Sequence, residues 1–344
     1  MPTPEAPTLV IGEALTDILD CPGEPRRSFP GGSPANVALG VARLGHPVRL
    51  ATRVGRDHFG EALRTHLSDS GVVLTEGSVA DTPTSTAIAH LDGRGAATYE
   101  FDISWDLPPG ALEPARTGAT GHLHTGSIAA ALAPGADQVL AAIEAARGRA
   151  TVSYDPNLRP ALLGPPEDER PRVEQLVSLS DVVKASQEDL EWLYPGQDIH
   201  EVAFRWARNG PSLVVLTLGA GGAQAWWRQG RHDLPATPVE VTDTVGAGDA
   251  FMAGLISGLL RAGMLGGGPE EPDGPRARTR LRSATAATRP HQELVQALDL
   301  AGRAAAFTCT RQGADPPTRA EISGWSPAAV RAGGSDHVAQ GPVR

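Results

Sequence analysis

Short apolar segments alternate with amphipathic segments along most of the chain. The apolar segments are rich in β-branched residues and end at polar or glycine-rich stretches, a pattern typical of buried strands. Between them, apolar residues recur at every third or fourth position, which gives each predicted helix one apolar face. The predicted strands are residues 8–14, 48–55, 122–127, 151–155, 182–185 and 212–218. The helical spacing is clearest at Val37, Val41 and Leu44, at Phe59, Leu63 and Leu67, and at Val139 and Ile143.

This alternation predicts an α/β fold with a doubly wound, mostly parallel sheet and helices on both of its faces. We expect the domain to span residues 8–318. Within it, residues 84–107 have the pattern of two strands joined by a turn at Asp92–Gly93. Together with residues 18–31, these strands predict a small β-sheet lid over one end of the main sheet.

Two segments have no apolar periodicity. Residues 262–291 mix Gly, Pro, Arg and Thr, and we expect them to form a flexible insertion. Residues 327–344 have the same character, which predicts a disordered tail.

Composition and charge exclude several classes of protein. The chain has 344 residues and a formal net charge of -10, and this acidic balance argues against general nucleic-acid binding. Cys21 and Cys309 are its only cysteines, too few for a disulfide framework or a four-cysteine zinc site. No segment reaches the roughly 18 apolar residues of a membrane span, and the first residues do not resemble a secretion signal. We therefore expect a cytoplasmic protein with no membrane partner.

The first motif with chemical potential is GGSPANVALGVARLG, residues 31–45. Ser33 is a residue type that caps helices, and Pro34 favours the first helical position, so a helix start is expected here. Asn36 in the first turn could hold several hydroxyl groups, since its amide both donates and accepts. The segment also resembles a G-x-S-x-G nucleophile elbow, which leaves a serine hydrolase using Ser33 as an alternative. Pro34 opposes that alternative because it has no N–H to offer an oxyanion hole.

The second motif is VTDTVGAGDAFMAGLISGLL, residues 241–260. Small residues at Gly246, Ala247 and Gly248 leave their N–H groups open at the start of a helix, which predicts an anion hole for a phosphoryl group. Asp249 in the first turn is either a helix cap or, beside a bound phosphate, a general base for an attacking hydroxyl. The motif is not a Walker A loop, because Lys184 is the only lysine and is followed by Ala185.

These two motifs resemble, in order and spacing, the signature segments of the ribokinase-like (PfkB) carbohydrate kinase family. The resemblance continues through VIGEALTDIL, DPNLRPAL, DVVKASQEDLEWL, LVVLTLGAGGAQAW and AAAFTCTRQGADPP, and is greatest to fructokinases. It implies transfer of the γ-phosphoryl group of ATP to a sugar hydroxyl, with fructose as the expected substrate and 2-keto-3-deoxygluconate or ribose as alternatives. A binding regulator with a dead kinase site is a further alternative, which the intact Asp249 opposes.

The resemblance also implies roles for individual residues. Asp249 matches the general base, and Gly246, Ala247 and Gly248 match the anion hole. The positions that match sugar contacts are Asp17, Gly32, Ser33 and Asn36, while Arg159 meets substrate or phosphate or is a surface arginine. The positions that match the nucleotide site are Thr217, Gly219 and Gly222 beneath ATP, and Lys184, Ser186 and Asp189 near phosphate and Mg2+. The family more often has Asn and Glu where this chain has Ser186 and Asp189. The shorter carboxylate of Asp189 favours contact with Mg2+ through water.

Two further expectations concern a cation and a second subunit. Many members of the family bind a monovalent cation, usually K+, through backbone carbonyls. The matching positions are Asp243, Val245, Thr308, Arg311 and Gly313. A hydroxyl ligand of some members falls at Pro317, so that one ligand is missing.

The lid has more apolar residues than a small solvated sheet hides, which predicts a homodimer joined through the lids. These residues are Ala87, Ala89, Tyr99, Phe101 and Ile103.

Overall fold

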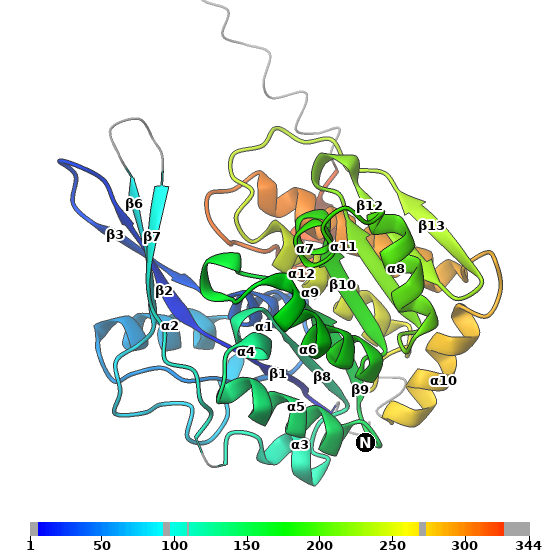
Figure 1. Ribbon diagram of the computed structural model, residues 1–344, viewed down its shortest axis with the longest axis horizontal. Coiled ribbons are helices and arrows are strands. Elements are labelled where there is room, and N and C mark those ends of the chain that lie inside the picture. Colours follow the sequence, from blue (N-terminus) through cyan, green and yellow to red (C-terminus); the bar gives the residue numbers. More distant parts are fainter. Residues whose placement is uncertain (1–5, 92–96, 109, 268–272, 327–344) are drawn as a thin grey trace, which may run out of the picture.

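The structure is a computed structural model, and it describes residues 6–91, 97–108, 110–267 and 273–326. Its main sheet has nine strands, and all neighbours are parallel except for an antiparallel pair of strands added at one edge. The order across this sheet is β13 (Gly230–Leu234), β12 (Ala223–Trp227), β11 (Leu213–Thr217), β10 (Val182–Ser186), β9 (Thr151–Asp155), β8 (His122–Gly126), β1 (Thr8–Ile11), β4 (Val48–Ala51) and β5 (Val72–Leu74). The doubly wound, mostly parallel fold predicted from the alternating pattern is therefore confirmed, as are the six predicted strands (Figure 1).

Helices cover both faces of this sheet. Adjacent residues of β1 point to opposite faces, with Val10 in one apolar cluster and Leu9 and Ile11 in the other. The face with Val10 is covered by α1 (Ser33–Arg43), α2 (His58–Asp69), α9 (Ala247–Arg261), α10 (Gly274–Ala284) and α11 (Gln292–Cys309). The other face is covered by α3 (Glu113–Thr117), α4 (Ser127–Ala131), α5 (Gly135–Ala146), α6 (Pro166–Leu179), α7 (Gln187–Leu193) and α8 (Ile199–Arg208). None of the described helices is both long enough and apolar enough to span a bilayer.

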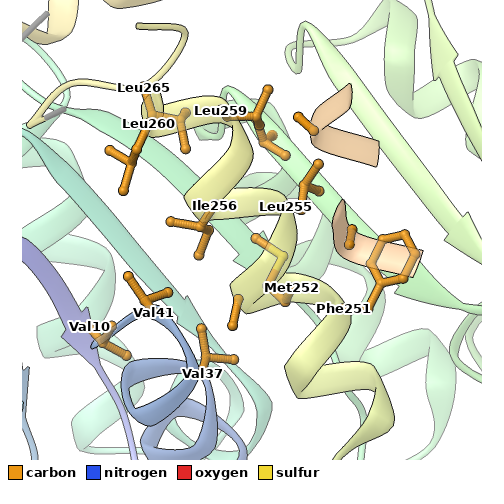
Figure 2. Packing of buried hydrophobic residues seen from close by; sticks show 14 of the residues in the cluster. Val10, Val37, Val41, Phe251, Met252, Leu255, Ile256, Leu259, Leu260 and Leu265 are labelled. Carbon is orange, nitrogen blue, oxygen red and sulfur yellow. The ribbon is translucent and has the colours of Figure 1, made fainter. Parts of the chain in front are cut away.

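Helix α9 is packed closely between α1 and α11. Figure 2 shows its apolar side chains, among them Met252, Leu255 and Ile256, directed into the cluster that also holds Val10. Its glycines lie directly against backbone, since a methyl group at Gly258 would come within 2.5 Å of the Cα atom of Ala297 on α11. The small residues of α9 thus fix its position, and with it the position of its N-terminus.

A second, small sheet projects from the body of the molecule (Figure 1). Its four strands, in spatial order, are β3 (Arg27–Gly31), β2 (Leu15–Asp20), β6 (Thr86–Leu91) and β7 (Ala97–Asp102). The two predicted strands of residues 84–107 are confirmed, while the predicted turn at Asp92–Gly93 lies outside the described residues.

The apolar face of the small sheet is partly covered within a single chain. Ala87 and Ala89 are buried, and Ala87 packs with Ile128 of the main body. Phe101 and Ile103 are half-buried against the same cluster. The most exposed large apolar residue of the described part of this sheet is instead Phe29, which is 38 % exposed.

The structure differs from the sequence analysis in residues 262–291. Gly274–Ala284 forms α10, whose Ala277, Leu281 and Ala284 are buried at helical spacing. Arg278 anchors the helix, because its guanidinium bonds to both carboxylate oxygens of Asp181 at 2.5 and 3.0 Å. The expectation of a segment without periodic structure is thus wrong for α10. Residues 268–272 and the predicted tail, residues 327–344, lie outside the described part of the chain.

Candidate functional site

Polar side chains from the two sequence motifs meet between the first turns of α1 and α9. The Asp249 carboxylate accepts hydrogen bonds from Ser33 Oγ at 2.7 Å and from Asn36 Nδ2 at 2.8 Å. Asp249 is only 7 % exposed, so both of its oxygens are held by fixed donors in a largely water-free place. The close packing of α9 on α1 therefore brings together residues that lie more than two hundred positions apart in the sequence.

Ser33 does not cap its own helix. Helix α1 begins at Ser33 after Gly32, and no side chain caps its N-terminus, so the prediction that Ser33 is the cap is wrong. Its hydroxyl is used in a tertiary contact instead, donating to Asp249 and accepting from Asn157 Nδ2 at 2.7 Å. Among the described residues no histidine bonds to Ser33 Oγ, so a serine nucleophile would have no imidazole base here.

The glycine pair before α1 allows three segments to approach one another. Gly32 has a φ of 101°, and a methyl group there would come within 2.5 Å of the Glu13 carbonyl oxygen. A methyl group at Gly31 would lie 2.1 Å from Asp17 Oδ2. Glycine is required at Gly32, because a larger residue would strain its backbone and push the turn after β1 away from α1, whereas a larger residue at Gly31 would displace the Asp17 side chain.

Asp17 faces the same space as Asp249. Desolvation by the surrounding protein raises the pKa of Asp17 to about 6. The charge of Arg159 opposes this rise, and the charge of Asp249 adds to it. The Asp17 side chain is exposed, so solvent screens the charges that act on it. Because the charges of Arg159 and Asp249 both act on Asp17, these three side chains surround one region of the site.

The N-terminus of α9 presents unpaired backbone donors. Among the described residues, no acceptor is found for the N–H groups of Gly246, Gly248 and Asp249. Ala247 differs from the prediction, because its N–H donates to the Thr244 carbonyl at 3.2 Å. Three open donors and the positive end of the helix dipole form a site for an anion. Asp249 N–H takes the place that the sequence analysis gave to Ala247.

A buried ion pair lies beneath these donors. Lys184 on β10 places its Nζ 2.6 Å from Asp155 Oδ2 at the end of β9, and the two side chains are 3 % and 1 % exposed. A methyl group at Gly248 would be 3.4 Å from Lys184 Nζ, so the ammonium group supports the N-terminus of α9 from below. Burial raises the pKa of Asp155 to about 6 although Lys184 lowers it. Burial favours the neutral form of Lys184, but the Asp155 carboxylate outweighs this effect and raises the pKa of Lys184.

Ser186 and Asp189 form a capping box at the start of α7. Asp189 Oδ2 accepts from both the N–H and the hydroxyl of Ser186 at 2.8 Å, and Ser186 Oγ accepts from Asp189 N–H at 3.0 Å. Asp189 Oδ1 accepts from Leu158 N–H at 2.7 Å. Both carboxylate oxygens are thus used to join the end of β10 to the loop after β9. The predicted role of this pair at phosphate and Mg2+ stays a prediction.

The predicted nucleotide loop lies at the carboxyl end of β11, beside the end of β10. Thr217 is the last residue of β11, and Gly219–Gly221 makes a short 3-10 turn after it. Gly222 has a φ of 88°, and a methyl group there would lie 2.2 Å from the Leu234 carbonyl oxygen. No heavy atom beyond the neighbouring residues comes within 4 Å of a methyl group built at Gly219. The loop therefore has an open side at the edge of the sheet where ligands of such folds bind.

The five predicted cation positions lie on two loops and the end of α11, and one carboxylate joins the two loops. Asp243 Oδ1 accepts from Val245 N–H at 3.0 Å, and Oδ2 accepts from Gly313 N–H at 2.9 Å. These N–H groups lower the pKa of Asp243. The second loop also touches the anion site, since a methyl group at Gly246 would be 2.5 Å from Ala314 Cβ. Of the remaining two positions, Thr308 lies in the last turn of α11 and Arg311 follows the helix, and Arg311 N–H donates to the Thr308 carbonyl at 3.0 Å.

Asn157 is a site residue that the sequence analysis missed. It lies in the DPNLR segment, from which only Arg159 was singled out. Its amide bonds to Ser33 and lies 3.4 Å from Asp249 Oδ1. The available signal was its place just after the buried strand β9, at the edge of the sheet where β10, the strand that carries Lys184, also ends.

Glu13 is the second missed residue. It follows β1, is only 3 % exposed, and accepts the N–H of Ala129 through Oε2 at 3.0 Å. Burial raises the pKa of Glu13 to about 7, although its hydrogen bonds and Arg159 lower it. A carboxyl group that is close to half-protonated at neutral pH therefore lies behind the glycine pair.

Comparison with known proteins agrees with this fold. The sequence matches the family described as pfkB family carbohydrate kinase over residues 10–321. Among curated relatives, a fructokinase of Klebsiella pneumoniae is 40 % identical over 263 residues, covering 74 % of this chain and 85 % of the relative. A fructokinase of Salmonella typhimurium is 35 % identical over 260 residues, covering 74 % and 85 %.

Solved structures give the same result. A fructokinase from Xylella fastidiosa with bound ATP superposes with a TM-score of 0.73 at 28 % identity, covering 92 % of this chain and 97 % of that one. A fructokinase double mutant from Vibrio cholerae O395, with fructose, ADP and potassium ion bound, has a TM-score of 0.69 at 29 % identity, covering 91 % and 95 %. The fold and the matched sequence thus define a phosphotransferase that acts on a sugar hydroxyl. The chain belongs to the pfkB family of carbohydrate kinases.

The buried Glu13 carboxyl makes the stability of the protein depend on pH. Its pKa rises from 4.5 in the unfolded chain to about 7 in the folded one, so the folded state keeps a proton that the unfolded state has released. Stability is therefore lost as pH rises through this window. Glu13→Gln removes the effect. The unfolding free energy of the variant should rise relative to wild type by about 3 kcal/mol between about pH 4 and pH 8.

Urea denaturation at both pH values measures this difference. Glu201→Gln, the same change at an exposed position of α8, serves as the control and should show no such trend. A constant difference between Glu13→Gln and wild type across the range would contradict the prediction.

Proposed function

We propose that this protein is an ATP-dependent fructokinase, which transfers the γ-phosphoryl group of ATP to a hydroxyl of fructose. The observation that carries the proposal is the position of Asp249, whose carboxylate is held by the sugar-side residues Ser33 and Asn36 while its own N–H belongs to the anion site of α9. A base and a phosphate site thus meet at one residue. The fructokinases among the relatives and solved structures favour fructose over 2-keto-3-deoxygluconate or ribose.

In this mechanism Asp249 accepts the proton of the attacking sugar hydroxyl. The N–H groups of Gly246, Gly248 and Asp249 then stabilise charge on the transferring phosphoryl group, and Lys184 adds a positive charge beneath them. Phosphoryl transfer needs mainly positioning and charge stabilisation, and these groups supply both. Ala247 contributes its small size and not its N–H, which is already bonded.

The sugar would bind between α1 and the small sheet. Asp17 and Asn36 offer acceptor and amide groups for neighbouring hydroxyls, and Gly32 allows the turn that carries Glu13 to approach the start of α1. Arg159 lies beside a group of mainly apolar residues that includes Ile128 and Leu162. The small sheet, through Ala87, covers the side of Ile128, which supports its role as a lid over the sugar.

ATP and Mg2+ fit the residues on the nucleotide side. Bound Mg-ATP supplies the phosphoryl group and neutralises part of its charge. The open side of the loop at Gly219 would receive the nucleotide, with Thr217 and Gly222 forming the loop. The buried Oδ1 of Asp155 has no hydrogen-bond partner among the described residues and would serve as an acceptor for water that binds Mg2+. Within those residues, no group of three or more His, Cys, Asp or Glu side chains could hold an ion, which favours Mg2+ held by phosphate and water.

We further propose a cytoplasmic location, because ATP is a substrate. Cys21 and Cys309 are both free thiols, as expected in a reducing compartment.

The function is tested by ATP consumption against a panel of sugars, with Asp249→Asn measured in the same assay. Fructose should give the highest kcat/KM. Asn keeps the shape of residue 249 and one acceptor oxygen but cannot take the proton, so kcat should fall by about 10² to 10⁴. The thermal midpoint should change little.

The control is Asp198→Asn, because Asp198 caps α8 by accepting from His200 N–H and lies on a different helix. It should keep full turnover. Wild-type turnover by Asp249→Asn would remove the base from the mechanism, and a wild-type protein that phosphorylates no sugar would contradict the function itself.

We propose K+ as an activating ion at the joined loops of Asp243 and Gly313, held by the backbone carbonyls of Asp243, Val245, Thr308, Arg311 and Gly313. K+ should raise kcat several-fold over Na+ by ordering the turn at Gly246, with little change in the KM for sugar. Asp243→Ala separates the loops and should abolish the response. Equal rates of the wild type in both salts would reject the site.

We propose that two copies join through their small sheets. The edge strands β3 and β7 have no strand neighbour on their outer side among the described residues, and Phe29 on β3 is exposed. Phe29→Asp should convert the dimer to a monomer in light scattering at micromolar concentration, whereas Val73→Asp, at an exposed apolar residue of the main sheet, should leave it a dimer. A monomeric wild type would contradict the proposal.

A further inference from the structure

We infer that Asn157 is a positioning residue, which sets the direction of a hydrogen-bond series that ends on the base. This inference rests on the proposed function, because it assigns a role within the same site. The series begins at Arg159, whose Nη1 lies 2.6 Å from Asn157 Oδ1. It continues from Asn157 Nδ2 to Ser33 Oγ at 2.7 Å. It ends where Ser33 Oγ meets Asp249 Oδ1 at 2.7 Å.

The chemistry of the first member fixes the direction of every later bond. A guanidinium group only donates, so the Asn157 oxygen must face Arg159 and its NH₂ group must face Ser33. Ser33 then receives a hydrogen bond from Asn157, and its own single hydrogen is free to point at Asp249. Without Asn157 the Ser33 hydroxyl could rotate, and Asp249 Oδ1 would lose a fixed donor.

The backbone of Asn157 is held in the conformation that this series needs. Its φ is 38°, in the left-handed region that Asn and Gly tolerate better than other residues. Arg159 also donates to the carbonyl oxygens of Asn157 and Leu158, at 2.8 and 3.1 Å. On the other side, Asp189 binds the N–H of Leu158. The capping box of α7 thus supports the series indirectly.

The series orients Asp249 before the sugar arrives. Ser33 donates to one oxygen of Asp249 and Asn36 donates to the other, so the carboxylate is held as an acceptor in a fixed plane. Asn157 has this effect through Ser33, since its own contact with Asp249 Oδ1 is long, at 3.4 Å.

Asn157→Gly tests the series without straining the loop, because glycine adopts a positive φ readily. We expect kcat for sugar phosphorylation to fall on the order of 10- to 100-fold, with the KM for ATP nearly unchanged. The urea midpoint should fall measurably, because the two hydrogen bonds of the Asn157 side chain to Ser33 and Arg159 are lost. Asn157→Asp should lower kcat further, because its second oxygen would draw the Ser33 hydrogen away from Asp249. Asn209→Gly, at an exposed residue after α8, is the matched control and should keep wild-type kcat. Wild-type kcat in Asn157→Gly would overturn the inference.

A double-mutant cycle with Ser33→Ala separates this role from general support of the loop. If Asn157 acts through Ser33, then Asn157→Gly should cost almost nothing further in the Ser33→Ala background, and additive losses in kcat would overturn the series. The same cycle measured on the urea midpoint needs no sugar, and additivity there would also overturn it. A wild-type protein inactive on every sugar would instead overturn the proposed function, while the urea cycle would still decide on the series.

Discussion

The geometry of the site depends on the close packing of α9 between α1 and α11. A methyl group at Gly40 would lie 2.6 Å from Ala253 Cβ, and Gly258 lies equally close to Ala297. Because small residues occupy the contacts, the helices approach to backbone distance and cannot slide without collision. The first turn of α9 is therefore fixed against that of α1, which allows a carboxylate on one helix to meet a hydroxyl and an amide on the other.

Buried charge is the second constraint on this end of the sheet. Glu13 and Asp155 lie in the interior, where burial opposes their ionised forms. Lys184 compensates Asp155 directly, whereas Glu13 has only hydrogen bonds and the more distant Arg159. Such an arrangement is costly for stability, since hydrophobic residues of the same size would pack without a desolvation penalty. The Lys184–Asp155 pair lies beside the N–H donors of α9, and this position explains why a phosphoryl-transfer enzyme would keep the pair despite its cost.

Much of the fold could be predicted from the sequence because its signals are local. Buried parallel strands need continuous apolar segments, and the six found in the sequence all form strands. Helix α10 could not be predicted in this way, because its buried face consists of Ala277, Leu281 and Ala284 among arginines, and it is anchored through Arg278 to a residue distant in the sequence. The local preference of Ser33 for capping was likewise overridden by its contact with Asp249.

The sequence by itself determined the family, the two motifs, and the types of residue available for base and anion chemistry, because these depend on residue identity and spacing. The tertiary structure alone decided which groups act on one another. It leaves the N–H of Asp249 without an acceptor among the described residues while that of Ala247 is bonded, and it brings Asn157 within hydrogen-bonding distance of Ser33. Hydrogen-bond direction and burial depend on three-dimensional neighbours, which no local pattern encodes.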